Sequence, residues 1–301
     1  MSRVLSFKSL CNKAVSKEKL LYVSFLSFVP YTPLYGIFFN QGMVMSMHSK
    51  AYIFRQQQLL VDDHFQLPQV ARLQHDLDLS ENGEIIARDL KEDEPVPEGY
   101  QLVPIRQLVQ VWNRPQFEQA SRAVQLLEWR RNHVFCSKCG HTTQQHASQY
   151  AMVCPSCGYN QYPRVNPCVI TIITRGKDEI LLAKNARNKT QMYSLIAGFV
   201  EVGETLEEAV RRETLEEVGL QIKNIQYLAS QPWPFPSNLM MAFKAEYHTG
   251  DIQIQENELS DAQFFKFDQL PEIPFKGSIA YAMIQHVMHG TPVADDSKEW
   301  L

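Results

Sequence analysis

Acidic and basic side chains between Gly198 and Leu220 have the types and the spacing of a site for cations and phosphates. Glu213 and Glu217 lie four residues apart, so on a helix they would share one face. Neighbouring carboxylates repel each other, and burial removes the water that stabilises their charges. A divalent cation such as Mg²⁺ binds carboxylate oxygen and keeps positions open for water and phosphate. We therefore expect Glu213 and Glu217 to bind such a cation.

The same segment predicts the helix that would position these carboxylates, over residues 206–218. Thr205 can cap its first turn, Glu208 completes a capping box, and Gly219 suits the left-handed residue that ends a helix. At about 100° per residue, one face of this helix is apolar and also contains the two carboxylates. The apolar members of that face are Leu206, Ala209 and Val210.

Arg212 and Glu216 flank this face of the predicted helix. They lie four residues apart, so we expect an ion pair that holds Glu216 in place. A solvated acidic helix would explain the remaining charges but not two carboxylates on an apolar face. Those remaining charges are Glu207, Glu208 and Arg211.

Residues 198–220 resemble the signature of the Nudix hydrolase superfamily, Gly-x5-Glu-x7-Arg-Glu-U-x-Glu-Glu-x-Gly-U, where U is apolar. Thr214 stands where an aliphatic residue is usual, and its methyl group can still pack. The resemblance implies an α+β fold, an α/β/α sandwich with a mixed sheet. It also implies metal-dependent hydrolysis of a nucleoside diphosphate linked to another group. The matching residues are Gly198, Glu204, Arg212, Glu213, Thr214, Glu216, Glu217, Gly219 and Leu220, and the catalytic set would include Glu204, Arg212, Glu213, Glu216 and Glu217.

Four cysteines form two Cys-x-x-Cys-Gly knuckles with fourteen residues between them. Each glycine lets backbone amides turn toward thiolate sulfur, and four thiolates make a tetrahedral site for Zn²⁺. Because protein ligands fill all four positions, we expect the zinc to be structural. Nearby His133, His141 and His146 are then not needed, and Cys11 and Cys168 are expected to be free thiols. The expected zinc ligands are Cys136, Cys139, Cys154 and Cys157.

A second motif, Ser230-Gln-Pro-Trp-Pro-Phe-Pro-Ser-Asn238, follows the predicted helix. Its prolines restrict the backbone, so we expect a stiff loop that holds Trp233 and Phe235 with little conformational entropy left to lose. Such a loop can shape a pocket for flat rings by stacking on them or by lining the wall. The alternative is a rigid turn whose aromatic side chains belong to the core.

Together, the knuckles, the helix and this motif resemble the NADH pyrophosphatase branch of the Nudix superfamily, strongly over about residues 100–290 and weakly before them. The resemblance implies hydrolysis of NADH, NAD⁺ or related dinucleotides to AMP and nicotinamide mononucleotide, with Mg²⁺ or Mn²⁺. It also implies a homodimer and the removal of NAD caps from RNA 5′ ends. Asn238 stands where the branch motif has serine. Asparagine keeps a donor and an acceptor, so we expect the same substrate class with altered contacts.

The resemblance also assigns roles to single residues. The expected Mg²⁺ or Mn²⁺ ligands are Glu213, Glu217, the carbonyl of Ala197, and Glu258, for which Glu256 is the alternative. Glu216 binds metal or orients water, and either Glu216 or Glu217 accepts the proton of the attacking water. Packing against the zinc module explains Tyr162 as well as substrate binding does. The candidates for holding the dinucleotide are Gln231, Pro232, Trp233, Pro234, Phe235, Pro236, Ser237, Asn238, Phe199, Tyr162, Glu258 and Ala280.

Residues 1–42 combine basic side chains with an apolar run that superficially resembles a signal peptide or a membrane anchor. Pro30 and Pro33 interrupt that run, and no small-residue cleavage site follows it. We therefore expect an extension that is poorly ordered or not naturally translated, and we do not expect a membrane protein.

The remaining residues predict three units. Short strand-like runs and turn signals indicate a small β-rich N-terminal domain over residues 43–130. A zinc ribbon follows at 131–162, and the Nudix domain would occupy 163–295. A strand over 193–197 should lead into the acidic helix.

Within the N-terminal domain, Glu-Asn-Gly-Glu at 81–84 predicts a hairpin turn. Residues 107–112 and 118–129 read as helical. Trp112 and Trp129 lie in these segments and are expected in the core.

The charge balance excludes one function class as a first expectation. A net charge of -4 and a pI near 6.2 argue against tight, sequence-independent binding to long nucleic acid. Thiol pairs that bind zinc are typical of a reducing compartment, so we expect a cytoplasmic protein. Two rival functions remain. One is a Nudix pyrophosphatase acting on ADP-ribose or dinucleoside polyphosphates, and the other is a zinc-ribbon nucleic-acid-binding protein with an inactive Nudix domain.

Overall fold

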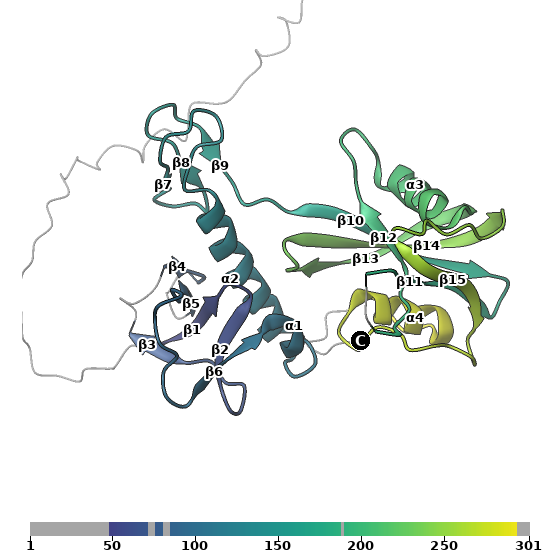
Figure 1. Cartoon of the computed structure of the whole chain (residues 1–301), viewed down its shortest axis with the longest axis horizontal. Coiled ribbons are helices and arrows are strands. Elements are labelled where there is room, and N and C mark those ends of the chain that lie inside the picture. The colour runs from purple at the N-terminus through teal and green to yellow at the C-terminus, as the bar shows by residue number, and fades with distance from the viewer. Residues whose placement is uncertain (1–47, 72–75, 81–84, 188–189, 294–301) are drawn as a thin grey trace, which may run out of the picture. The chain divides into compact units, whose positions relative to one another are not determined.

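The computed structural model describes residues 48–71, 76–80, 85–187 and 190–293 (Figure 1). The predicted extension at 1–42, Cys11 and the predicted turn at 81–84 lie outside the described residues. The described residues belong to one compact unit. The helices within these ranges are too short or too polar to span a bilayer.

The N-terminal domain contains a six-stranded sheet of order β4-β5-β1-β2-β6, with β3 paired to β1. β1 runs parallel to β5, and the other pairs are antiparallel. The β-rich N-terminal region predicted from the sequence is therefore confirmed. Its strands are β1 (His48–Arg55), β2 (Gln58–Asp62), β3 (Gln69–Ala71), β4 (Leu77–Asp78), β5 (Ile85–Asp89) and β6 (Tyr100–Pro104).

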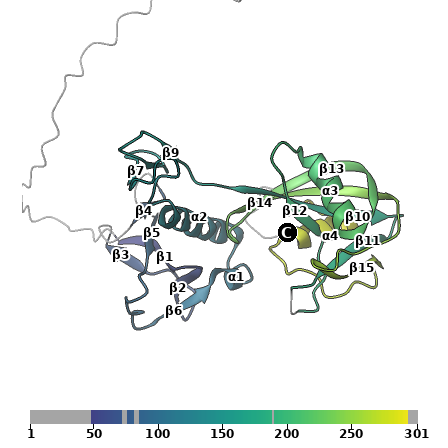
Figure 2. The same ribbon diagram turned by 45° about the horizontal axis from the view of Figure 1, so that its top comes forward.

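Two helices follow this sheet, α1 (Ile105–Leu108) and α2 (Arg114–Asn132). α2 begins at the cap Asn113 and lies against one face of the sheet, where its apolar side chains share a core with Phe54 (Figure 2). Trp112 and Trp129 are buried in this core, as predicted.

The helix predicted over 107–112 is wrong in its bounds, because α1 ends at Leu108. The chain then turns tightly, and the N–H of Trp112 donates to the carbonyl of Leu108 at 2.9 Å. This turn directs the indole into the core, where its Nε1 donates to the carbonyl of Phe65 at 3.0 Å. The stabilisation gained by burying the Trp112 side chain is larger than the local preference of this segment for helix.

The zinc ribbon is a small three-stranded antiparallel sheet of order β7-β8-β9. Its strands are β7 (Gln144–Gln145), β8 (Met152–Val153) and β9 (Asn160–Gln161). Gln161 is buried, and its Oε1 accepts a hydrogen bond from the backbone of Ser137 at 2.7 Å. One strand thereby holds the first cysteine knuckle in place.

The C-terminal domain contains a mixed sheet of order β13-β14-β10-β11-β15, with β12 paired to β10. β10 and β14 are parallel, and the other pairs are antiparallel. Its strands are β10 (Asn166–Arg175), β11 (Glu179–Asn185), β12 (Ile196–Phe199), β13 (Gln221–Trp233), β14 (Asn238–Thr249) and β15 (Leu259–Lys266).

Helices α3 (Leu206–Val218) and α4 (Ile279–His289) cover opposite faces of this sheet. Successive residues of β10 show this, because Val169 packs with Val210 of α3 and Ile170 packs with Met283 of α4. The predicted α/β/α sandwich is therefore confirmed.

The strand predicted over 193–197 begins later than expected, because β12 starts at Ile196. Ser194 makes only an isolated bridge to Ala183. The residues before β12 instead line a cavity, as described below.

The segment predicted as a stiff loop from Ser230 to Asn238 is mostly strand. β13 continues through Trp233, and β14 begins at Asn238, which pairs with Trp233. Only the turn at 234–237 is loop. β13 is an edge strand, where proline is tolerated because one side of the strand needs no ladder hydrogen bonds.

Candidate active site

α3 has the caps and the bounds that the sequence predicted. The Thr205 hydroxyl accepts from the Glu208 amide at 3.3 Å, and the Glu208 carboxylate accepts from the Thr205 amide at 2.8 Å. Gly219 ends the helix in the left-handed conformation, with φ of 72°. These caps fix where the helix starts and stops, and therefore which side chains face the sheet.

The buried face of α3 holds apolar residues together with Glu217, which is 6% exposed. Ala209 and Val210 are fully buried on this face. Thr214 is buried as well, and its hydroxyl donates to the Val210 carbonyl at 2.7 Å. This bond explains how threonine fits a position where an aliphatic residue is usual.

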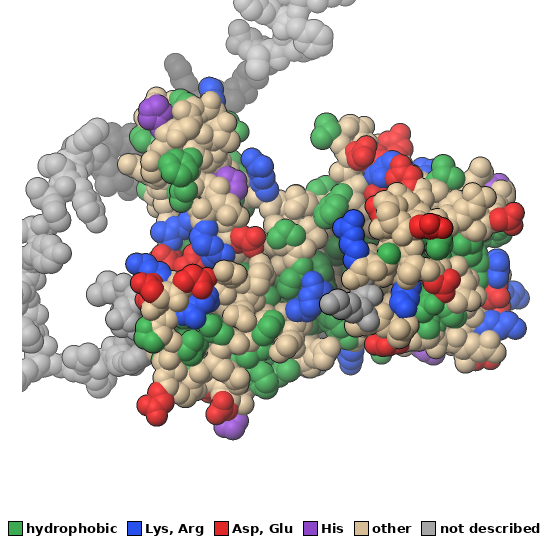
Figure 3. Space-filling model, viewed as in Figure 1, with side chains coloured by type: hydrophobic (Ala, Val, Ile, Leu, Met, Phe, Trp, Pro, Cys, Tyr) green, Lys and Arg blue, Asp and Glu red, His purple; other side chains and the backbone are tan. Residues whose placement is uncertain are grey.

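Arg212 connects four groups around the start of α3. Its guanidinium binds both carboxylate oxygens of Glu204, at 2.7 and 2.8 Å, and one oxygen of Glu213 at 2.9 Å. The predicted ion pair with Glu216 is present at 3.1 Å, and a fourth bond reaches the Phe199 carbonyl. The hydrogen bonds from Arg212 lower the pKa of Glu204 to about 2. The space-filling view shows acidic and basic side chains gathered beside α3 (Figure 3).

Glu217 lies beside carboxylates and has no arginine partner among the described ion pairs. Burial, together with the charges of Glu213 and Glu258, raises its pKa to about 8. Burial also raises the pKa of Glu213. These carboxylates need a positive group beyond Arg212, and their hard oxygen atoms fit a divalent cation.

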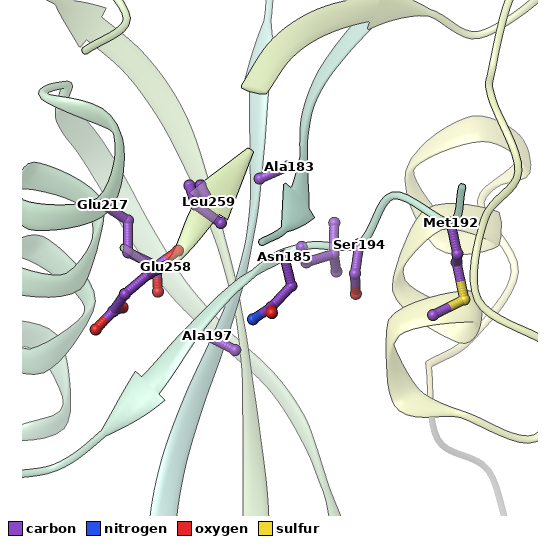
Figure 4. Close-up of a pocket in the computed structure, with 9 residues that line it drawn as sticks. Ala183, Asn185, Met192, Ser194, Ala197, Glu217, Glu258 and Leu259 are labelled. Carbon is purple, nitrogen blue, oxygen red and sulfur yellow. The ribbon is translucent and has the colours of Figure 1, made fainter. Parts of the chain in front are cut away.

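Glu258 lies beside Glu217 at a cavity of about 240 Å³, which we call the acidic cavity. Figure 4 shows the two side chains next to each other, one from α3 and one from the segment that enters β15, with Asn185 and Ser194 farther along the cavity wall. Glu258 also lines a second cavity of about 380 Å³, together with Glu213. Glu256, the alternative considered from the sequence, lines neither cavity.

Gly198 provides the space that Glu213 occupies. A Cβ atom at Gly198 would lie 1.8 Å from Cδ of Glu213 and about as close to both carboxylate oxygens. The backbone of β12 can therefore lie this close to the Glu213 carboxylate only because residue 198 is glycine and has no Cβ atom.

A third cavity, of about 210 Å³, is lined mainly by apolar and aromatic side chains, and we call it the ring cavity. Trp233 and Phe275 line it as a stacked pair, with ring centroids 6.4 Å apart and planes at 28°. Ala280 contributes to its wall from α4. Ala197 lines all three cavities, so they meet at the end of β12.

Gln231 lines the ring cavity and joins β13 to α4. Its Nε2 donates to the Gly277 carbonyl at 2.9 Å, and its Oε1 accepts from the Ile279 amide at 2.7 Å. The side chain thereby closes the N-terminal end of α4 against the sheet.

Other residues of the second motif line none of the cavities described. Phe235 packs with the core of the N-terminal domain, and the hydroxyl of Ser237 lies 3.0 Å from Gln125 Oε1 on α2. Asn238 is buried, and its amide donates to the Phe235 carbonyl at 3.1 Å. Pro234 is buried, whereas Pro232 and Pro236 are exposed. The turn therefore contacts the N-terminal domain, and the serine-to-asparagine difference lies in this turn.

Two further candidates lie apart from the ring cavity. Phe199 is 53% exposed and lines the cavity of about 380 Å³. Tyr162 is also largely exposed, and its hydroxyl lies 3.4 Å from Gln149 in the ribbon. Substrate binding by Tyr162 stays a prediction.

The four predicted zinc ligands form one cluster, with all four sulfur atoms within 4.8 Å of one another. Within the described part of the chain, no other group of three or more potential ligands is that tight, so Glu213, Glu217 and Glu258 do not all lie within this distance of one another. The backbone amide of Lys138 points at the Cys136 sulfur at 3.4 Å. Four thiols with amide donors fit a structural Zn²⁺.

Some residues of the site carry no sequence motif. Met192 and Ser194 line both the acidic cavity and the ring cavity, and Arg106 and Phe275 line the ring cavity. They lie outside the sequence motifs, Arg106, Met192 and Ser194 before the acidic helix and Phe275 between β15 and α4. Their proximity depends on tertiary packing, which no local pattern encodes.

Two family models match the chain. The NUDIX domain matches residues 164–286, and the NADH pyrophosphatase zinc ribbon domain matches residues 131–162. The protein named NAD-capped RNA hydrolase NudC from Pectobacterium atrosepticum is 50% identical over 169 residues, which are 56% of this chain and 65% of that protein. A protein of the same name from Salmonella schwarzengrund is 47% identical with the same coverage. The match thus spans 65% of the length of these curated relatives.

Among solved structures, a NUDIX hydrolase from Nitrosomonas europaea is 26% identical. The match covers 52% of this chain and 94% of that chain, with a TM-score of 0.46.

Proposed function

We propose that this chain, which contains a Nudix domain behind an NADH pyrophosphatase zinc ribbon, hydrolyses the diphosphate of NADH and NAD⁺. The products are AMP and nicotinamide mononucleotide, which is reduced when it comes from NADH and oxidised when it comes from NAD⁺. The observation that carries the proposal is the meeting of an acidic cavity and an aromatic cavity at Ala197. A dinucleotide has a charged diphosphate next to flat rings, so its two parts match the two cavities. Relatives named NAD-capped RNA hydrolase support the same substrate class and add NAD-capped RNA to it.

In the proposed reaction, water attacks one phosphorus, the bond from that phosphorus to the bridging oxygen breaks, and the other phosphate leaves. Bound Mg²⁺ or Mn²⁺ would supply positive charge for the diphosphate and lower the pKa of the attacking water. Glu213, Glu217, Glu258 and the Ala197 carbonyl would hold this cation. Either Glu216, tied to Arg212, or Glu217 takes the proton from the water. The aromatic pair in the ring cavity positions one ring of the substrate.

The decisive experiment supplies NADH, NAD⁺, ADP-ribose and NAD-capped RNA side by side and compares kcat/KM with and without Mg²⁺ or Mn²⁺. We expect turnover of NADH, NAD⁺ and the capped RNA only with the cation. Glu217→Gln should fold normally and lose about 10²–10⁴-fold in kcat. Glu207→Gln, on the exposed face of the same helix, is the matched control and should keep full activity.

Two outcomes would overturn the proposal. Efficient hydrolysis of ADP-ribose or dinucleoside polyphosphates, with NADH and NAD⁺ left intact, would establish the rival Nudix activity. Tight RNA binding in a gel shift, without hydrolysis of any substrate, would establish the nucleic-acid-binding alternative.

We also propose that the chain forms a homodimer and that its zinc is structural. Phe135, Tyr159, Tyr162 and Val165, in and just after the ribbon, are exposed although they are large and apolar. Exposed apolar groups of this kind mark protein interfaces. Light scattering should give twice the chain mass of 34.7 kDa, and Phe135→Ser with Tyr162→Ser should shift the protein toward the monomer. Free thiols that bind zinc fit a reducing compartment such as the cytoplasm.

A further inference from the structure

Arg187 follows β11 by two residues and lines the cavity of about 380 Å³, together with Glu213 and Glu258. This cavity shares Asn185, Ala197 and Glu258 with the acidic cavity, so the two meet along one wall. Glu213 and Glu258 are two of the expected metal ligands. Arg187 therefore borders the place where the proposed function puts the diphosphate of the substrate.

Hydrogen bonds position the backbone of Arg187 relative to Glu258. The amide of Ala186 donates to the Glu258 carbonyl at 2.7 Å. The amide of Arg187 donates to Oδ1 of Asn185 at 2.9 Å, and Asn185 pairs with Leu259 of β15. Figure 4 shows Asn185 and Glu258 at the acidic cavity. The strands that position Glu258 thus also position the backbone from which the exposed Arg187 side chain extends.

Two arginines line this cavity among the described residues, and they differ in what they already bind. The five N–H donors of Arg212 make five hydrogen bonds, all to glutamate side chains and one backbone carbonyl. None of the described ion pairs or cation–π contacts includes Arg187. Arg212 is therefore committed to the carboxylates of the protein, whereas the guanidinium of Arg187 can bind a ligand.

Cleavage of a diphosphate creates negative charge in a cavity whose other charged side chains are mostly acidic. Its lining residues include Glu201, Glu213 and Glu258. When the bond between phosphorus and the bridging oxygen breaks, the electron pair stays on the leaving phosphate, which becomes more negative. A guanidinium is positively charged and presents a fork of N–H donors that matches phosphate oxygens.

We infer that Arg187 binds the diphosphate of the substrate and stabilises the negative charge that the leaving phosphate gains. The inference rests on the proposed function and deepens it, because it assigns a positive side chain to the phosphates. This interaction becomes stronger as charge develops during the reaction. Arg187 should therefore contribute more to kcat than to the affinity for the diphosphate before cleavage.

The first test measures kcat and KM for NADH, with saturating Mg²⁺, in the full-length wild type and in a charge series at position 187. Arg187→Gln should lower kcat by about 10²-fold, the typical cost of removing one preorganised donor group. Arg187→Lys should lose less, because it keeps the charge without the fork of donors. Arg187→Glu should lose more than either. Wild-type kcat in Arg187→Gln, or the same loss in all three variants, would overturn the inference.

The second test measures binding without turnover. Methylenediphosphonate resembles the diphosphate, but its P–C–P link cannot be hydrolysed. In calorimetric titrations with Mg²⁺ present, Arg187→Gln should bind it about tenfold more weakly than the wild type, which corresponds to the loss of one hydrogen-bonded contact between charged groups. Unchanged affinity would contradict direct contact between Arg187 and the phosphates.

Arg211→Gln is the matched control for both tests. Arg211 is an exposed arginine of α3 whose Nη1 donates to the Glu207 carbonyl at 3.0 Å, and it lines none of the cavities described. Its removal changes the net charge of the protein by the same amount. We expect kcat and the affinity for methylenediphosphonate to stay at the wild-type values.

Failure of the inference can be distinguished from failure of the proposed function. If the wild type hydrolyses neither NADH nor NAD⁺, the proposed function is wrong. If the wild type hydrolyses them and Arg187→Gln keeps its kcat and its affinity for methylenediphosphonate, only the role of Arg187 is wrong.

Discussion

Glu217 is buried beside other carboxylates. Its ionised form therefore destabilises the folded state when no cation is bound. It is 6% exposed, and its pKa is raised to about 8 by burial and by the charges of Glu213 and Glu258. Arg212, only five residues away in the chain, compensates Glu204 and not Glu217. We therefore expect a bound cation, and not another side chain, to compensate the charge of Glu217.

This destabilisation predicts how stability depends on pH when divalent cations are removed. The native state holds the Glu217 proton up to a pKa of about 8, whereas the unfolded chain releases it near the ordinary glutamate pKa of 4.5. Between these values the native state binds more protons, so stability falls as pH rises, and the full cost is present above about pH 8. Glu217→Gln removes this cost.

In EDTA, Glu217→Gln should melt at the wild-type temperature near pH 4.5 and a few degrees higher, roughly 2–4 °C per kcal/mol regained, above pH 8. Added Mg²⁺ should stabilise the wild type at pH 8 and close the gap, because the cation binds only the folded state. Equal melting temperatures of the two proteins at pH 8 in EDTA would show that Glu217 is solvated.

Single residues also show what could be predicted at this scale. Glu213 and Glu217 were predictable because carboxylates on an apolar face contradict the local pattern and so indicate a ligand. Gly198 and Arg212 were predicted through the signature that they share with these carboxylates. Arg106 was not predicted, because it belongs to no motif and only the fold places this residue of α1 at the ring cavity. The zinc ligands were predicted because their spacing alone defines the cluster.

The close contact between β12 and α3 helps to position the carboxylate of Glu213, in addition to the orientation of the helix. β12 passes so near to α3 that a Cβ atom on Gly198 would overlap the carboxylate of Glu213. That carboxylate is the far end of a flexible side chain, so an added methyl group would displace it without unfolding the domain. The contact between these two elements thus determines where one expected metal ligand points.

Gly198→Ala should therefore separate activity from stability. We expect kcat to fall by about 10²-fold or more, because a ligand displaced by about 1 Å can cost that much, while the melting temperature stays within about 2 °C of the wild type. Gly203→Ala should instead lower the melting temperature and leave kcat near the wild-type value. Gly203 has a φ of 88° and open space where the Cβ would lie, so alanine there is strained yet far from any partner. Retained activity in Gly198→Ala would mean that Glu213 need not lie where it does.

Elements were predictable where local chemistry defines both ends. α3 has the predicted bounds because Thr205, Glu208 and Gly219 terminate it independently of the rest of the fold. α1 and the hairpin of β13 and β14 were mispredicted because tertiary contacts override the local pattern there. Trp112 turns into the core, and Trp233 is held by pairing with Asn238.

At the scale of the whole molecule, the zinc ribbon connects the N-terminal and C-terminal domains in the chain, and we expect the proposed structural zinc to stabilise it. Its three strands are two residues each, too short to bury a core, so the thiolate cluster must supply the folding free energy. Gln161 links this cluster to the backbone of His133 and Phe135, next to the end of α2. Loss of zinc should therefore destabilise this segment first.

Cys154→Ser should contain far less than one zinc per chain by atomic absorption, and its ribbon should become sensitive to protease. The physical reason is that three thiolates without the fourth lose the closed tetrahedral site. Cys168→Ser is the control, because Cys168 is a buried thiol of β10 outside the cluster, and it should retain one zinc. A full zinc complement in Cys154→Ser would show that another group completes the site.

The turn at 234–237 has a consequence for any recombination of this protein with its relatives. Trp233 at one end of the turn lines the ring cavity, while Phe235 packs beneath Arg106 and Ser237 reaches Gln125 on α2. A chimera that joins a foreign N-terminal domain to this C-terminal domain would therefore replace Arg106, which lines the ring cavity. The two domains must therefore be exchanged together if the packing at this turn and the wall of the ring cavity are to be preserved.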